Sequence, residues 1–303
     1  MNKISVVAEN PESTVVAEYQ GMKTKQTEYQ SEADLEKAFI KQLQNQAYDY
    51  LPINSEKDLI DNLRHQLEKL NDYHFTDKEW DRFFKQEIAN PNFGIKEKTK
   101  IIQEDYKKVL YYEKPVDNYQ FRNILLIDKD NIHNNTLQVI NQYETDEGKR
   151  ANRYDATVLV NGLPLVHIEL KRRGVDIKDA FNQINRYQND SFWAGSGLYE
   201  FVQIFVISNG TYTKYYSNTT RQSHISENSG ISSKKGKKTS NSFEFTSWWA
   251  DRKNKPIIDL IDFAKTFFAK HTILNVLTKY CIFTSDEMLM VMRPYQIVAT
   301  ESI

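Results

Sequence analysis

The chain has 303 residues, with 40 Lys and Arg against 41 Asp and Glu, which gives a formal net charge of −1. This length suffices for one large domain or two smaller ones. The balanced charge excludes a general attraction to nucleic acid or membranes, so any such contact needs a local patch. The single cysteine, Cys281, excludes an internal disulfide and is typical of a reducing compartment. No apolar run reaches the roughly 20 residues that span a bilayer, and no signal pattern opens the chain. We therefore expect a cytoplasmic protein without a membrane partner.

The N-terminal third is predicted to be mainly helical. Residues 14–17 are β-prone. Apolar residues recur three or four positions apart in the later segments, so we expect helices over residues 31–50, 54–70, 76–89 and 96–112. Ser31 is a capping residue, and Thr76 with Glu79 forms a capping box, which gives Glu79 a structural role.

Strands and helices are both predicted in the rest of the chain. In chain order we expect strands 120–128 and 136–143, a β-hairpin of residues 154–160 and 165–171, a helix 176–190, strands 201–208, 211–217 and 243–249, a helix 256–269, an apolar element 273–283 and an amphipathic segment 285–303. Residues 219–242 are rich in Ser, Gly and Lys, which is typical of a loop.

The hairpin carries the most informative pattern. Its two arms alternate in polarity around Asn161-Gly162, a strong turn signal. A two-residue loop would put Asp155 and Glu169 on opposite faces, whereas a three-residue loop, residues 161–163, would put them opposite each other. The apolar pattern favours the second register. It predicts an apolar face that includes Tyr154 and a polar face of Asp155, Thr157, His167, Glu169 and Lys171.

Two carboxylates and an ammonium on one face indicate metal-dependent chemistry. Neighbouring carboxylates stay ionised together mainly when a cation lies between them, and oxygen ligands suit Mg²⁺ or Mn²⁺. Lys171 can orient an attacking water or neutralise charge that develops on a phosphoryl group. A solvated strand face with an ordinary ion pair explains the same pattern, and from the pattern alone both interpretations stay open.

Several further residues qualify as contacts. Gln183 and Tyr187 lie four apart and so share a helix face, and Arg172 and Arg173 extend the basic edge beside Lys171. A loop cluster can follow a phosphate backbone or be simply solvated; it contains Lys234, Lys235, Lys237 and Lys238.

Other residues have a structural explanation that competes with a functional one. His167 shares the polar face, but a histidine beside carboxylates more often only forms hydrogen bonds. Glu36 can supply a further metal-site acid, although a solvated helix position explains it better. Trp248 and Trp249 are expected to pack in the interior rather than to stack on bases.

Asp155, the Glu169-Leu170-Lys171 triplet and Gln183-x-x-x-Tyr187 resemble the PD-(D/E)xK nuclease superfamily, in its RecB-like branch. Within it, the sequence more closely resembles the restriction and motor subunits (HsdR) of type I restriction–modification enzymes, and residues 153 to about 217 carry most of that likeness.

A second stretch supports the same family. Residues 292–296, Met-Arg-Pro-Tyr-Gln, resemble the entry to the first helicase lobe of those subunits. Two departures are visible: Tyr154 stands where the family motif has Pro, and no Walker A motif occurs, so we expect a nuclease fragment without its own ATPase site.

The resemblance implies a restriction-endonuclease-like fold, with a mixed β-sheet flanked by helices and a helical N-terminal extension. It implies an endonuclease domain over residues 1–250, with its core at about 115–250. Connecting helices and the start of a helicase lobe would occupy residues 251–303.

The resemblance also implies Mg²⁺-dependent cleavage of double-stranded DNA, in a complex with methyltransferase and specificity subunits. Asp155, Glu169 and the Leu170 carbonyl would bind the metal, and Lys171 would be the catalytic lysine. DNA contacts would come from Gln183, Tyr187, Arg172 and Arg173. Gln296 would read the adenine of ATP, only in a full-length subunit. A repair nuclease of the same superfamily and a non-enzymatic docking module are the alternatives.

Overall fold

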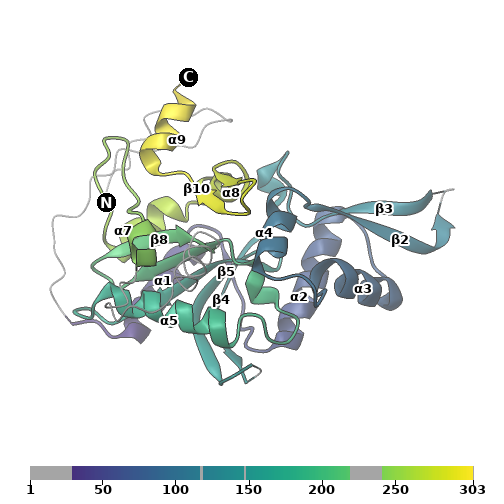
Figure 1. The fold of residues 1–303 in the computed structure, drawn as a ribbon, viewed down its shortest axis with the longest axis horizontal. Coiled ribbons are helices and arrows are strands. Elements are labelled where there is room, and N and C mark those ends of the chain that lie inside the picture. The colour runs from purple at the N-terminus through teal and green to yellow at the C-terminus, as the bar shows by residue number, and fades with distance from the viewer. Residues whose placement is uncertain (1–28, 117–118, 147, 219–240, 303) are drawn as a thin grey trace, which may run out of the picture. The chain divides into compact units, whose positions relative to one another are not determined.

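The computed structural model describes residues 29–116, 119–146, 148–218 and 241–302 (Figure 1). The expected strand 14–17 and the lysines of the loop cluster lie outside these residues. The chain forms two compact units. Unit 1 comprises Met1–Ala47, Ile168–Ile184 and Ile204–Ile303, and unit 2 comprises Tyr48–His167 and Asn185–Gln203. The expected division at residue 250 stays a prediction.

Six strands form the central sheet, in the order β1-β4-β5-β6-β7-β8. Their bounds are β1 (Asp49–Tyr50), β4 (Leu137–Thr145), β5 (Asn152–Val160), β6 (Leu163–Leu170), β7 (Ile204–Ser208) and β8 (Thr213–Ser217). The sheet is mixed, because β1 runs parallel to β4 whereas β4 is antiparallel to β5 and β7 to β8. The expected α/β class with a mixed sheet and flanking helices is confirmed.

Unit 2 contains the helical segments that precede the sheet. They are α2 (Glu56–Asn71), α3 (Asp77–Phe83), the π-helix η1 (Phe84–Ile88), α4 (Ile95–Gln103) and the 3-10 helices η2 (Ile132–Asn134) and η3 (Leu198–Phe201). The helix expected over residues 96–112 is wrong beyond Gln103. There the chain forms β2 (Lys107–Val116), which lies beside β3 (Tyr119–Leu125) as a two-stranded ribbon (Figure 1). Exposed Tyr111 alternates with buried Leu110, which is the period of a strand.

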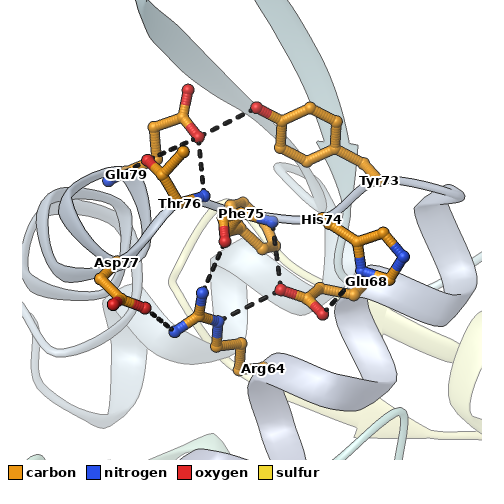
Figure 2. Close-up of polar contacts among 8 residues, drawn as sticks. All are labelled: Arg64, Glu68, Tyr73, His74, Phe75, Thr76, Asp77 and Glu79. Carbon is orange, nitrogen blue, oxygen red and sulfur yellow. Dashed lines mark hydrogen bonds and ion pairs between the residues drawn. The ribbon is translucent and has the colours of Figure 1, made fainter.

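Polar side chains join α2 to α3 in unit 2 (Figure 2). The Arg64 guanidinium contacts Glu68 at 3.1 Å and Asp77 at 2.8 Å. The Thr76 hydroxyl accepts the Glu79 amide N–H, and the Glu79 carboxylate accepts the Thr76 amide N–H, so the predicted capping box is confirmed.

Unit 1 contains α1 (Glu32–Gln44), whose Ser31 cap is confirmed, but the helix expected to reach residue 50 ends earlier. The other elements outside the sheet are the 3-10 helix η4 (Asn241–Phe245), α7 (Leu260–Phe267), α8 (Lys270–Thr278), β9 (Cys281–Phe283), β10 (Leu289–Val291) and α9 (Pro294–Glu301). The strand expected over residues 243–249 is wrong, since η4 and a single bridge from Ser247 to Tyr215 take its place.

The cores of the two units are rich in aromatic residues. In unit 1, Phe39 of α1 meets Phe268 edge to face at 5.4 Å, and Trp249 is buried against Phe267, as expected for a packing tryptophan. Helix α5 (Ile177–Asp190) follows β6 and confirms the helix predicted over residues 176–190. Among the described residues, no helix is both long and apolar enough to cross a membrane.

Candidate active site

The turn between β5 and β6 contains two residues, Asn161 and Gly162, with φ of 51° and 82°. The expected three-residue loop is therefore wrong. Both residues adopt the positive φ of a type I′ turn, whose twist matches that of the flanking strands. The Asn161 amide donates to the Leu126 carbonyl and to Asn135 Oδ1, so the turn is fixed by buried hydrogen bonds.

Strand β5 does not alternate regularly near Asp155. The Tyr154 and Tyr199 ring centroids are 4.5 Å apart, and Thr157 Oγ1 lies 3.3 Å from the Tyr199 hydroxyl. Residues three apart on a regular strand face opposite sides, so the predicted separation of Tyr154 from the polar face is wrong. Across the ladder, Gln142 has φ of 53°, which marks the irregularity on β4.

His167 of β6 is fully buried in an aromatic cluster of unit 2. Its ring meets Tyr154 at 5.7 Å and Phe192 at 5.6 Å, and its Nδ1 lies 3.2 Å from Thr157 Oγ1. Burial lowers the pKa of His167 to about 4, although the nearby Asp155 charge acts in the opposite direction. The imidazole is thus neutral near pH 7 and has a sufficient structural role; contact with a metal-bound water stays a prediction.

Tyr187 of α5 is also buried, with 1% of its surface exposed. Its hydroxyl donates a 2.9 Å hydrogen bond to the Arg153 carbonyl, and its ring lies 4.8 Å from that of Tyr154. Tyr187 is therefore placed to hold β5 at Arg153, two residues before Asp155. Direct contact of Tyr187 with DNA stays a prediction.

The second half of the predicted site lies in unit 1, where β6 ends. The Lys171 ammonium donates to Glu169 Oε1 at 3.1 Å and to the Leu170 carbonyl at 2.9 Å. The Glu169 side chain is fully buried and that of Lys171 is 13% exposed. The structure thus brings Glu169, Leu170 and Lys171 together. Asp155 belongs to unit 2, and its pairing with Glu169 stays a prediction.

A third acid approaches Lys171 from α1. Glu32 Oε1 lies 4.0 Å from Lys171 Nζ, and its side chain is half exposed. The sequence interpretation selected Glu36, one turn further along the same helix and 9% exposed. Residues four apart share a helix face, so the same face would have indicated Glu32 as well.

The two arginines that follow Lys171 differ in their exposure and in their partners. Arg172 is exposed on the surface. Arg173 instead is held inside unit 1 by Gln30, Thr211 and Asp259 at 2.7, 3.0 and 3.4 Å, which gives it a structural role.

The two predicted glutamine contacts lie on different helices. Gln183 lies on α5 and is half-buried. Gln296 of α9 accepts the Arg293 amide N–H through its side chain, as part of the helix N-terminus. Contact of Gln183 with DNA and of Gln296 with ATP stay predictions.

Unit 2 also has a cavity of about 220 Å³, lined by acids such as Glu56, Glu144 and Asp146 and by the rings of Tyr143 and Tyr154. Tyr154, which precedes Asp155, lines this cavity, but Asp155, Glu169 and Lys171 do not. The cavity is therefore not the predicted catalytic site. Among the described residues, no three His, Cys, Asp or Glu side chains are grouped to hold a metal ion. The predicted ligands are only two carboxylates, of Asp155 and Glu169, and the Leu170 backbone carbonyl. A metal site of this kind does not need three such side chains.

Comparisons with known proteins all find subunits of type I restriction enzymes. Residues 29–224 match the model of the family described as "Type I restriction enzyme R protein N terminus". The chain is 48% identical over 276 residues to the Escherichia coli "Type I restriction enzyme EcoprrI endonuclease subunit", covering 91% of this chain and 82% of that relative. It is 36% identical over 281 residues to the SsaAORF53P endonuclease subunit of Staphylococcus saprophyticus, again over 91% of this chain but only 27% of the relative.

Proposed function

Because this chain belongs to the family of type I restriction enzyme R protein N termini, we propose that it is the nuclease module of such an enzyme. In this role it hydrolyses phosphodiester bonds of double-stranded DNA, with Mg²⁺ or Mn²⁺ as cofactor. The relatives named above are called endonuclease subunits, which supports the reaction class.

The observation that carries the proposal is the arrangement at the end of β6. A buried carboxylate, a backbone carbonyl and a lysine meet within 3.1 Å. A purely solvated strand face would leave Glu169 accessible to water, but this side chain is fully buried. Placing a charged carboxylate and an ammonium in the interior is costly, so a functional reason for retaining them is favoured.

The residues at this position fit a divalent cation. Glu169 Oε1 and the Leu170 carbonyl already surround a positive group, the Lys171 ammonium, and both are hard oxygen ligands of the kind that Mg²⁺ prefers. When bound, the metal would polarise a phosphoryl oxygen and lower the pKa of a water. Lys171 would stabilise the negative charge that develops on the phosphate.

Asp155 would supply the second carboxylate. Its negative charge acts on His167 in unit 2, and Glu169 follows His167 by two residues on β6, which is the strand repeat. This relation supports a shared role for the two acids. Tyr187 holds the backbone at Arg153, two residues before Asp155, which restricts the position of the Asp155 backbone.

The partners proposed for the assembled enzyme are methyltransferase and specificity subunits, the latter setting the DNA sequence that is recognised. ATP would be bound at Gln296 only in a longer subunit. This chain spans 27% of the staphylococcal relative, so these properties of a whole enzyme are proposals for it.

Calorimetry of metal binding tests the chemistry on the chain itself. We expect Mg²⁺ and Mn²⁺ to bind the unaltered chain, and Asp155→Asn and Glu169→Gln to weaken binding at least tenfold. Asp190→Asn is the control, because Asp190 pairs with Lys149 at 4.0 Å and is not one of the proposed ligands. Metal binding that survives both substitutions would favour a docking module over a nuclease.

Cleavage tests the function in the reconstituted assembly with its partner subunits. Asp155→Ala, Glu169→Ala and Lys171→Ala are each expected to abolish double-strand cleavage while circular dichroism shows an intact fold. Full cleavage by all three variants would remove the assignment. Cleavage by the unaltered chain without any methyltransferase partner would favour a repair nuclease.

A further inference from the structure

Two lysines of unit 1 lie beside the same aromatic ring. Lys178, in the first turn of α5, has its ammonium 5.4 Å from the Phe243 ring centroid, and Lys214 of β8 has its ammonium 4.8 Å from it. Lys214 also lies 4.7 Å from the Trp248 ring. Chain segments that are distant in sequence thus bring two positive charges to one place.

These charges have no acidic partner in the described part of the chain. Lys214 donates to Thr246 Oγ1 at 3.0 Å, a neutral acceptor, and no carboxylate there forms a salt bridge with either lysine. The nearby Asp176 carboxylate accepts the backbone N–H of Lys178 and caps α5. Aromatic faces attract cations only weakly, so they compensate the mutual repulsion in part.

The environment of Lys214 agrees with this picture. Burial lowers the pKa of Lys214, and the charge of Lys178 lowers it further. Protonating Lys214 beside the positive charge of Lys178 therefore costs free energy that an anion between the two side chains would return. The positive end of the α5 dipole adds to the same attraction.

The position is continuous with the proposed catalytic lysine. The Lys171 amide donates to the Ser208 carbonyl at 2.8 Å, and Ser208 pairs with Thr213, the neighbour of Lys214. Tyr215 points to Phe267 of α7, so Lys214, one residue earlier, lies on the other side of β8, toward α5. The backbone thus connects the end of β6, which is followed by Lys171, to β8, which carries Lys214.

We propose that Lys178 and Lys214, with the Phe243 and Trp248 rings beside them, form a binding site for a phosphate group, supplied by the backbone of the DNA substrate. This inference rests on the proposed function, which it deepens by naming a contact outside the β6 cluster. The site is electrostatic and carries no base readout, so its contribution is independent of DNA sequence.

Salt-dependent DNA binding tests the proposal on the full chain, without divalent metal. The anisotropy of a labelled 30-base-pair duplex is measured between low and moderate salt. Each phosphate contact contributes about 0.9 to the slope of log K against log salt, so Lys178→Met with Lys214→Met, which removes one phosphate contact, is expected to reduce the slope by about 0.9. Lys178→Arg with Lys214→Arg is expected to keep it.

Lys265→Met is the matched control, because Lys265 of α7 is a part-buried lysine of unit 1 already paired with Asp262 at 3.5 Å. It is expected to leave the slope unchanged. A double Met variant with the slope of the unaltered chain and an unchanged thermal midpoint overturns the proposal. A thermal midpoint lowered in both double variants would mean that the lysines only stabilise the fold.

A calorimetric arm with ATP separates the two sources of phosphate. Loss of ATP binding in the double Met variant, with duplex binding unaffected, overturns the assignment to DNA in favour of a free nucleotide. The metal-binding variants Asp155→Asn and Glu169→Gln report separately on the proposed function. Normal metal binding with no effect of the double Met variant on duplex binding would therefore overturn only the phosphate site.

Discussion

The Tyr187 hydroxyl donates a 2.9 Å hydrogen bond to the backbone carbonyl of Arg153. This bond links α5 to the start of β5, two residues before Asp155. The tyrosine thus reaches the predicted site through the strand that carries the acid, not through its own exposed surface, since only 1% of it is exposed.

Replacing Tyr187 with Phe tests this link. The substitution keeps the ring but removes the part-buried hydrogen bond to the Arg153 carbonyl, so we expect the free energy of unfolding to fall by about 1 kcal/mol. Urea unfolding measures the loss. Tyr111→Phe is the control, because Tyr111 is 61% exposed on the β2–β3 ribbon. Equal stabilities of the two variants would contradict the role assigned to the bond.

The acid at the start of α1 gives a second prediction. Glu32 lies 4.0 Å from Lys171 Nζ and is half exposed, so solvent screens its charge. We expect Glu32→Gln to lower DNA cleavage by the reconstituted enzyme about three- to tenfold. Glu36→Gln, one helical turn away, is the matched comparison. A larger loss with Glu36→Gln would instead support Glu36 as the further metal-site acid, the role that the sequence left possible.

The buried imidazole of His167 predicts a stability that depends on pH. Its pKa is about 4 in the folded chain and about 6.5 when unfolded. The unfolded chain therefore binds a proton first as the pH falls. Stability is complete above pH 6.5 and is lost as the pH falls toward 4, by about 2 kcal/mol between pH 7.5 and 5.

Urea unfolding at both pH values, without added metal, measures this contribution. His167→Gln is expected to be less stable at pH 7.5 but to lose about 2 kcal/mol less on acidification than the unaltered chain. His133→Gln, at an exposed position, should keep the full pH dependence. An unchanged dependence in His167→Gln would show that other groups cause the acid sensitivity.

The turn glycine gives a prediction with a built-in comparison. A Cβ on Gly162, at φ 82°, would lie 2.6 Å from Leu63 Cα, whereas a Cβ on Gly174, at φ 89°, would meet nothing within 4 Å. Gly174→Ala should therefore lose only the conformational term of about 1–2 kcal/mol. Gly162→Ala must also displace backbone and should lose more than about 3 kcal/mol or fail to fold. Thermal unfolding distinguishes these outcomes, and similar midpoints would contradict the close approach to α2.

Local signals in the sequence were sufficient for the helix starts and the main strands. Ser31 and Thr76 cap helices through contacts within one turn, so neighbouring residues alone reveal them. The segment after Gln103 was misassigned because it satisfies both a helical and a strand pattern, and only pairing with β3 decides between them.

Long-range contacts explain the errors at the hairpin. The loop length was predicted from a strict alternation that fails near Asp155, where Tyr154 and Thr157 both reach Tyr199. Tyr199 lies 42 residues after Thr157, so the hairpin sequence itself does not reveal these contacts. The contacts of Lys171 with Glu169 and with the Leu170 carbonyl agree with expectation. These residues are only two and one positions before Lys171, so the strand geometry nearly determines the contacts.

The close packing of Gly162 against Leu63 also has a consequence for the order in which the chain folds. Hairpin tips normally tolerate inserted peptides, since they project into water, but this tip ends on a helix that was synthesised much earlier. During translation α2 emerges first and can be in place before the hairpin arrives. The helix α2 is thus synthesised before the β5–β6 turn that packs against it. A circular permutation that placed α2 after the hairpin in the sequence would leave the turn without its packing surface on α2 while the chain is being synthesised.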